Sequence, residues 1–192
     1  MRDSEAERIG RRLHKEGLAS GNFGNLSVRD EAGFYIKRRN AYLDMPGALV
    51  FVPQNGPVPV DASRESIVHR EIYQNTSAKA IVHAHPSYAI ALSYFCDEIT
   101  PYDYEGEMLC PRVRVVEGAS GTRDLARTVA SALRSSPVVI VRGHGTFAIG
   151  ATLDEAYVIT STVEHACRIL FLRSQVKIEG FPTRDSAGFP RD

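Results

Sequence analysis

The segment Ala80-Ile-Val-His-Ala-His-Pro86 combines an apolar run with two histidines and a proline. An apolar run ended by a proline predicts a short buried strand over residues 80–85. Side chains two residues apart on a strand point to the same face, so His83 and His85 lie together. Two imidazoles at a strand end can hold one metal ion, although histidines also serve as ordinary core residues.

The pattern on either side of this segment mixes strands and helices. Apolar runs predict strands over residues 26–29, 34–37, 49–53, 113–116, 137–141 and 147–149. Helical spacing and capping residues predict helices over residues 4–15, 63–74 (capped by Ser63), 87–94, 122–133 (capped by Thr122) and 152–175. Because the order lacks a strict βαβ rhythm, we expect the α/β class, as a single three-layer α/β/α domain around a largely antiparallel sheet.

Length and composition fit one globular domain. The chain has 192 residues, of which 43% are hydrophobic and 24% charged, so a packed core is expected. We expect this domain to span residues 1–179. Residues 180–192 are rich in Gly, Pro and charge, and they are expected to form a loose C-terminal tail.

The charge balance excludes several classes of partner. There are 23 Lys and Arg residues against 23 Asp and Glu residues, which leaves a formal net charge of zero. Nucleic-acid binders and proteins that bind anionic membranes need a basic surface, so neither partner is expected. The first 17 residues are charged throughout and lack the apolar core of a secretory signal. Three widely spaced cysteines suggest free thiols, and we expect a cytoplasmic protein.

Two further residues can complete a metal site with His83 and His85. His144 stands between glycines in Arg142-Gly-His-Gly145, directly after a buried apolar run, where glycine leaves the ring accessible. Glu65 falls on the first turn of a predicted helix, and His69 follows one turn later. Each alone is compatible with a structural turn or a solvated side chain. Together, three histidines and one carboxylate match a zinc ligand set, and the carboxylate can also serve as a general base.

A loop rich in Gly and Asn can bind an anion. Gly21-Asn-Phe-Gly-Asn25 and the nearby Ser27 offer backbone N–H groups, amides and a hydroxyl. The helix start at Ser63 adds further N–H donors, so a phosphate fits between the two. A tight structural turn is the alternative interpretation of the loop.

Four motifs in order resemble the class II aldolase/adducin family, and most closely its zinc-dependent L-fuculose-1-phosphate aldolases. The motifs are GNFGNLSVR (residues 21–29), SRESIVHREIY (63–73), AIVHAHP (80–86) and GHGTFAIG (143–150), and the likeness covers about residues 7–172. The resemblance implies an α/β/α domain that forms a homotetramer with sites between subunits. It further implies one Zn²⁺ per subunit, with other divalent metals possible, and a phosphorylated ketose substrate.

The resemblance also implies a role for individual residues. His83, His85 and His144 would hold zinc, and Glu65 would ligate zinc at rest and act as a base or acid in turnover. Asn25 and Ser63 match phosphate-contacting positions, and Asn22 stands where the family often has Thr or Ser. Tyr104 aligns with a tyrosine that reaches the neighbouring subunit's site as a proton donor.

The chain departs from the family at the expected phosphate site. Tyr35-Ile-Lys-Arg-Arg-Asn40 replaces the usual Ile-Thr-x-[Thr/Ser]-Gly, so Arg39 and Asn40 stand where the family has a hydroxyl and a glycine. Arg64 replaces a frequent second serine. Arginine binds phosphate well, so the predicted phosphate site extends to Arg39, although a different or larger anion is also compatible.

The reaction implied is the reversible cleavage of a ketose 1-phosphate into dihydroxyacetone phosphate and a short aldehyde such as lactaldehyde. Three alternatives remain on this scaffold. Asp103 favours a pentulose-phosphate 4-epimerase, because it stands where the resemblance places a catalytic Asp of those enzymes. Two features argue against this reaction: Glu65 stands where the epimerases have Asp, and no tyrosine follows Leu172. A methylthio-sugar-phosphate dehydratase shares the metal set. A non-enzymatic adducin-like interaction domain normally lacks the ligands that are all present here.

Overall fold

The structure is a computed structural model and describes residues 2–176. Over these residues eight strands form one sheet: β1 (Asn25–Asp30), β2 (Gly33–Lys37), β3 (Leu49–Pro53), β4 (Ala80–Ala84), β5 (Glu98–Ile99), β6 (Val113–Val116), β7 (Val138–Val141) and β8 (Gly145–Gly150). Their spatial order is β3-β2-β1-β4-β8-β7-β6-β5. The tail predicted over residues 180–192 lies outside the described residues.

The sheet is largely antiparallel, as predicted. Each neighbouring pair of the described strands is antiparallel except β6 and β7, which run parallel. β4 lies between β1 and β8, so strands from the two ends of the chain flank it. This arrangement brings the end of β4, the start of β8 and the start of β1 to one edge of the molecule.

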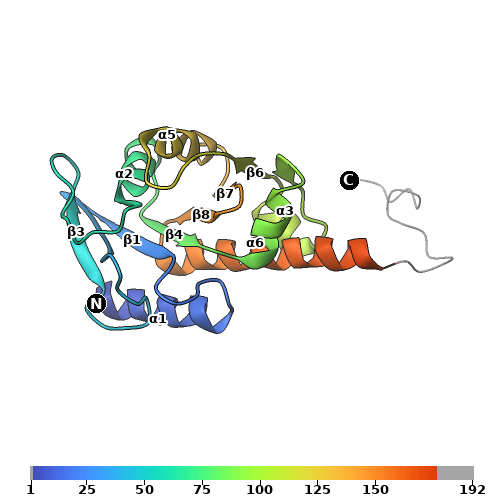
Figure 1. Cartoon of the computed structure of the whole chain (residues 1–192), viewed down its shortest axis with the longest axis horizontal. Coiled ribbons are helices and arrows are strands. Elements are labelled where there is room, and N and C mark those ends of the chain that lie inside the picture. The colour runs from blue at the N-terminus through green and yellow to red at the C-terminus, as the bar shows by residue number, and fades with distance from the viewer. Residues whose placement is uncertain (1, 177–192) are drawn as a thin grey trace.

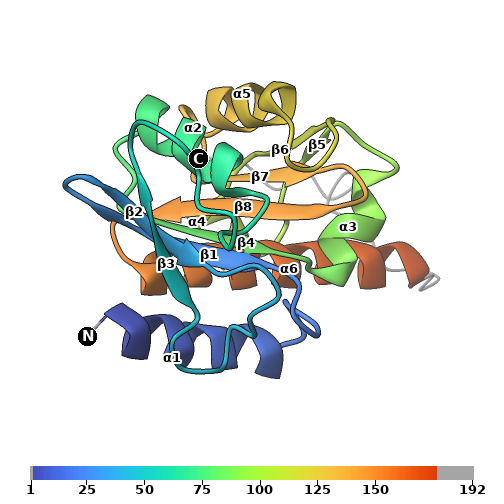
Figure 2. The same cartoon turned by 60° about the vertical axis from the view of Figure 1, so that its left-hand side comes forward.

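Helices cover both faces of the sheet and complete the three layers (Figures 1 and 2). One face carries α2 (Ser66–Asn75) and α5 (Arg123–Ala132), and the other carries α1 (Arg2–Lys15), α3 (Ser87–Ser93) and the long α6 (Leu153–Gln175). The short α4 (Tyr104–Leu109) packs beside α6. The predicted α/β/α architecture is confirmed.

Alternation along β4 fills two separate cores. Ile81 packs with Phe147 against the α2 and α5 side, while Val82 and Ala84 pack against α1 and the start of α6. His83 pairs with Phe147 across β4 and β8, so it shares the face of Ile81. A shift of one residue in register would bury His83 on the wrong face, so the apolar pattern fixes its direction.

Two predicted caps form as expected. The Thr122 side chain accepts a hydrogen bond from the backbone N–H of Leu125 at the start of α5, at 3.2 Å. The Thr152 hydroxyl accepts from the N–H of Glu155 at 3.1 Å, and the Glu155 carboxylate accepts from the N–H of Ala151 at 2.7 Å. These bonds satisfy helix N–H groups that have no partner within the helix.

The prediction that Ser63 caps the second helix is wrong. α2 begins at Ser66, its N-cap is Glu65, and no side chain caps it. Ser63 instead forms a tight turn, in which its carbonyl accepts from the Ser66 hydroxyl at 2.6 Å. Because of this turn, Glu65 precedes the helix rather than lying on its first turn.

The structure adds two short elements that the sequence pattern does not predict, β5 and α4. β5 has two residues, too few to show alternation, and of the α4 residues only Gly106 is buried. Among the described residues, no helix has the length and apolar character needed to cross a bilayer.

Candidate metal centre and active site

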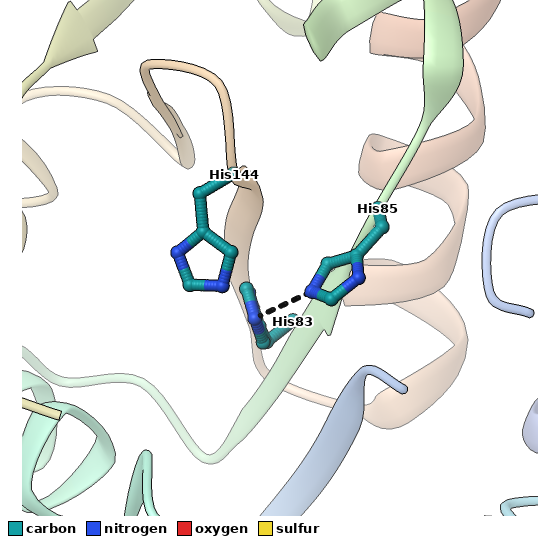
Figure 3. A group of neighbouring side chains, drawn as sticks. All are labelled: His83, His85 and His144. Atoms are coloured by element: carbon teal, nitrogen blue, oxygen red, sulfur yellow. Dashed lines mark hydrogen bonds between the residues drawn. The ribbon is translucent and has the colours of Figure 1, made fainter. Parts of the chain in front are cut away.

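Three histidines from two neighbouring strands converge at one end of the sheet (Figure 3). His83 lies on β4, His85 directly follows it, and His144 directly precedes β8. One ring nitrogen from each lies within 4.8 Å of the others. The sequence prediction that these residues come together is confirmed, and they form a donor set that can surround a single ion.

The backbone fixes the tautomer of His83. Its Nδ1 lies 2.9 Å from the carbonyl oxygen of Thr146. A carbonyl only accepts, so Nδ1 carries the proton and Nε2 keeps its lone pair. Nε2 lies 3.1 Å from Nε2 of His85, so the two ligand atoms face each other. An outer hydrogen bond of this kind orients a metal-binding histidine.

The surroundings keep His83 and His85 neutral. Burial lowers the pKa of His83 well below its ordinary value, and the neighbouring His85 and His144 lower it further. Burial, followed by the charge of His144, lowers the pKa of His85 to about 4. His83 also stacks on Phe147, with ring centroids 4.1 Å apart and planes at 15°. Neutral imidazole is the form that binds metal, so the donor set fits a divalent ion.

Glycines on both sides of His144 allow its close approach to β4. Gly143 has φ of 66°, and a Cβ there would lie 2.4 Å from the Tyr94 hydroxyl. A Cβ on Gly145 would lie 2.2 Å from the Ala84 carbonyl oxygen. A larger residue at Gly145 would clash with the backbone of β4, and one at Gly143 would have to adopt a strained positive φ and displace the Tyr94 side chain.

Glu65 is close by but is not part of the three-histidine group. It is 5% exposed, and its Oε1 accepts a hydrogen bond from the hydroxyl of Ser120. Its Oε2 is buried and has no hydrogen-bond partner among the described residues. Glu65 lines the same cavity as the histidines, and its roles as a base and as a ligand both stay predictions.

One cavity of about 560 Å³ contains the histidines and most of the predicted phosphate residues. Asn22, Asn25, Ser63 and Arg39 all line it. Asn25 is 3% exposed, and its Oδ1 has no hydrogen-bond partner within residues 2–176. A buried amide oxygen without a partner is costly, which marks this position as one where a ligand or water is needed.

Three cations surround the same cavity. Lys37 is buried, and its Nζ donates to the carbonyls of Asn22, at 2.5 Å, and Ala41, at 2.9 Å. Burial lowers the pKa of Lys37 to about 8. Arg39 and Arg64 are exposed, and neither forms an ion pair with a carboxylate of the described residues. The cavity therefore has unneutralised positive charge at its mouth.

Two candidate residues lie apart from this cavity. Tyr104 begins α4, is 76% exposed, and is not among the cavity-lining residues of its own chain. His69 is fully buried, with Nδ1 2.6 Å from the Ser27 hydroxyl, which lies 2.7 Å from the Tyr73 hydroxyl. His69 thus belongs to a buried polar chain next to the site, not to the ligand group.

The family follows from this site and a matching sequence model. The model described as Class II Aldolase and Adducin N-terminal domain matches residues 5–171. The chain belongs to this family. The predicted resemblance to this family is therefore confirmed. The three histidines and Glu65 lie in the matched region.

Relatives of this class II aldolase and adducin domain differ in the reactions that their names state. An L-fuculose phosphate aldolase of Methanococcus maripaludis is 28% identical over 170 residues, which cover 86% of this chain and 93% of that protein. A 3-oxo-tetronate 4-phosphate decarboxylase of Haemophilus influenzae is 26% identical over 189 residues, covering 88% and 87%. The crystal structure of L-fuculose-1-phosphate aldolase from Thermus thermophilus has a TM-score of 0.88 and 38% identity, covering 90% of this chain and 94% of that one.

Sequence reasoning missed Ser120. Residues 117–121 are Glu-Gly-Ala-Ser-Gly, and no helical or strand period singles out the serine. Its only signal is a hydroxyl between two glycines directly before the capped helix α5. Only the folded chain brings it to Glu65, 55 positions earlier.

Proposed function

We propose that this protein is a zinc-dependent class II aldolase. It reversibly cleaves a ketose 1-phosphate, L-fuculose 1-phosphate or a close analogue, into dihydroxyacetone phosphate and a short aldehyde such as lactaldehyde. The observation that carries the proposal is the group of His83, His85 and His144 inside a cavity that also holds Glu65 and unpaired cations. The relatives named as fuculose phosphate aldolases support this substrate class.

The three histidines would hold the metal, and Glu65 would be its fourth ligand at rest. Three imidazoles with one carboxylate suit zinc, which is usually four-coordinate. When bound, the metal supplies Lewis-acid charge to the oxygens of the substrate. The orientation of His83 by the Thr146 carbonyl and the burial of His85 prepare these ligands before any ion arrives.

Glu65 would move the proton at the reacting carbon. In the cleavage direction, the bond between the carbinol carbon next to the carbonyl and the following carbon breaks. Its electron pair stays with the fragment that becomes dihydroxyacetone phosphate. The hydroxyl of the other fragment gives up its proton and becomes the aldehyde oxygen. Glu65, buried and within the cavity, returns a proton to the carbon that received the electron pair.

Asn25, Ser63, Asn22 and Arg39 would bind the phosphate. They line the cavity on the side formed by the Asn22–Asn25 loop and the turn before α2. The amide and hydroxyl groups would orient the phosphate by directed hydrogen bonds, and Arg39 would attract its negative charge. Fixing the phosphate places the reacting carbon at a set distance from Glu65.

The assembly proposed is a homotetramer with sites between subunits, in which Tyr104 serves the neighbouring site. The exposed position of Tyr104, away from its own cavity, agrees with this role. In the addition direction it would protonate the aldehyde oxygen. We place the protein in the cytoplasm, because Cys96, Cys110 and Cys167 are unpaired thiols.

A second candidate reaction is the decarboxylation of a phosphorylated 3-oxo acid. Arg39 and Arg64 offer charge for a carboxylate in addition to the phosphate, and a relative named as a 3-oxo-tetronate 4-phosphate decarboxylase matches most of the chain. Loss of carbon dioxide leaves an electron pair on the carbon next to a carbonyl, as aldol cleavage does. The same residues would therefore serve either substrate.

The deciding experiment is the release of dihydroxyacetone phosphate from L-fuculose 1-phosphate. We expect release by the zinc-loaded protein, loss after chelation and recovery on adding zinc. His85→Ala should lose both bound zinc and activity, whereas His165→Ala, an exposed histidine on α6, should keep both. No release by folded, zinc-loaded protein would contradict the aldolase proposal. Release of carbon dioxide from 3-oxo-tetronate 4-phosphate under the same conditions would then favour the second candidate.

A further inference from the structure

Ser120 is the one described side chain with a hydrogen bond to the Glu65 carboxylate. It lies in the loop between β6 and α5 and lines the cavity together with the three histidines. The side chain is part of the exposed wall rather than the core, because Ser120 is an exposed residue. Its contact with Glu65 is thus made at the site surface and contributes little to the packing of the fold.

The loop that carries Ser120 is held in place by its neighbours. The carbonyl of Ala119 accepts from the Thr122 hydroxyl at 2.7 Å and from the Thr122 N–H at 3.3 Å. Thr122 itself caps α5. A Cβ on Gly121 would lie 3.5 Å from the Arg64 carbonyl oxygen, so the loop packs against the chain next to Glu65. The hydroxyl of Ser120 is therefore fixed opposite Glu65 before substrate binds.

Glu65 has unequal surroundings at its two oxygens. Oε1 accepts from Ser120, whereas Oε2 is buried without a partner among residues 2–176. In this orientation Glu65 is not grouped with the three ring nitrogens, which lie within 4.8 Å of one another. The carboxylate is turned toward Ser120 and keeps one oxygen free.

We propose that Ser120 is a positioning residue that holds Glu65 off the metal, so that the Ser120 hydroxyl and the metal compete for the same carboxylate. The proposal rests on the metal-dependent function proposed above. In the resting protein Glu65 would be the fourth metal ligand for part of the time and would accept from Ser120 for the remainder. With substrate bound in the cavity, Glu65 would stay on Ser120 and exchange its proton with the substrate from there.

The competition predicts opposite changes in two measured quantities. A hydrogen bond to a charged group is worth enough to change an equilibrium about tenfold or more. Removing the hydroxyl leaves Glu65 with the metal as its better partner, so zinc should bind more tightly. Substrate must then displace a more firmly held carboxylate, so KM for the ketose phosphate should rise. A change that only loosens the loop would weaken both kinds of binding.

The test compares Ser120→Ala, Ser120→Thr and the control Ser131→Ala, an exposed serine on α5. Zinc affinity of the metal-free proteins is measured by competition with a chromophoric chelator, and KM is measured separately. We expect Ser120→Ala to bind zinc about tenfold more tightly and to have a KM about tenfold higher. Ser120→Thr keeps the hydroxyl and should match the wild type, as should Ser131→Ala.

A second comparison shows whether the effect passes through Glu65. In a Glu65→Gln background, Ser120→Ala should leave zinc affinity unchanged, because the competing carboxylate is absent. An unchanged or weaker zinc affinity of the single variant, or an equal shift in the Glu65→Gln background, would overturn the role of Ser120 alone. A wild-type protein that binds no zinc would overturn this role and the proposed function together. Zinc binding with the expected shifts but without cleavage of any ketose phosphate would overturn only the proposed reaction.

Discussion

Asn25 and His83 are direct partners across the antiparallel pair of β1 and β4. Paired residues in antiparallel strands project from the same face of the sheet. A predicted phosphate-binding amide and a predicted metal ligand are therefore fixed relative to each other by backbone hydrogen bonds, without any flexible loop between them. The sheet itself sets the span that a substrate must bridge between phosphate and metal.

Asn25→Asp should impair substrate binding while leaving the fold intact. The side chain keeps its shape, but its charge repels a phosphate that the amide would contact. We expect KM for the ketose phosphate to rise at least about tenfold, from the loss of one hydrogen bond and the added repulsion. The control is Asn55→Asp in the exposed turn after β3, which should leave KM unchanged. Equal KM values for both variants would remove Asn25 from the phosphate site.

Arg39→Ser and Arg64→Ser restore the hydroxyl-bearing residues that the family resemblance implies, and they test the charge at the cavity mouth. Each should raise KM about five- to tenfold with little change in kcat, because the arginines act on binding of the anion. The wild-type kcat/KM should also fall more steeply with added salt than that of the double variant. Arg127→Ser, on the outer surface of α5, serves as the control. A fall in kcat at constant KM would contradict a binding role.

We expect His69 to make the fold sensitive to acid. Burial lowers its pKa to about 3, whereas in the unfolded chain the ordinary value is about 6.5. Below about pH 6.5 the unfolded state therefore binds a proton that the folded state does not bind. The contribution of His69 to the free energy of unfolding is fully present above this pH and decreases as the pH falls toward 3. This residue alone should cost about 2 kcal/mol of unfolding free energy by pH 5.

The measurement is urea denaturation of the metal-free protein at pH 7, 6 and 5. His69→Asn keeps an acceptor for the Ser27 hydroxyl but cannot take up the proton. The variant should be less stable at pH 7, yet it should lose about 2 kcal/mol less than the wild type between pH 7 and pH 5. Parallel stability curves for the two proteins would show that His69 is protonated equally in both states.

Mixed assemblies test the role of Tyr104. Glu65→Gln and Tyr104→Phe should each have sharply lowered turnover as pure proteins. If Tyr104 serves a neighbouring site, an equal mixture of the two chains contains about a quarter of sites with both native residues, and activity returns in that proportion.

The matched control is a mixture of Glu65→Gln with His85→Ala. Both residues line the cavity of one chain, so no site in a mixed assembly regains both. Recovery in the first mixture and not in the second supports the shared site. No recovery in the first mixture, with mixed assemblies shown to be present, would remove Tyr104 from the neighbour's active site.

The sequence predicts the central part of this fold well, because apolar patterns and side-chain chemistry agree there. Val113–Val116 and Leu49–Pro53 are strands with the predicted bounds, and Thr122 and Thr152 cap their helices. His83 and His85 lie two residues apart at the end of β4, and His144 directly precedes β8. Pairing of β4 with β8 then brings the two sequence motifs together.

The remainder depends on contacts between distant segments. The sequence pattern predicts Ser63 as a helix cap, but Ser63 forms a turn with Ser66, and α2 begins only at Ser66. Ser120 reaches Glu65 only because the loop before α5 packs against the turn before α2. No local period encodes such a contact, since it arises from the packing of α2 beside α5.

The position of β4 between β1 and β8 also orders the events of synthesis. On the ribosome, His83 and His85 emerge well before His144, and one edge of β4 stays open until β8 arrives. His144 directly precedes β8, so the pairing of this last neighbour with β4 also places the third imidazole. A nascent chain that lacks β8 therefore has two of the three imidazoles, and only the pairing of β8 with β4 assembles the full donor set.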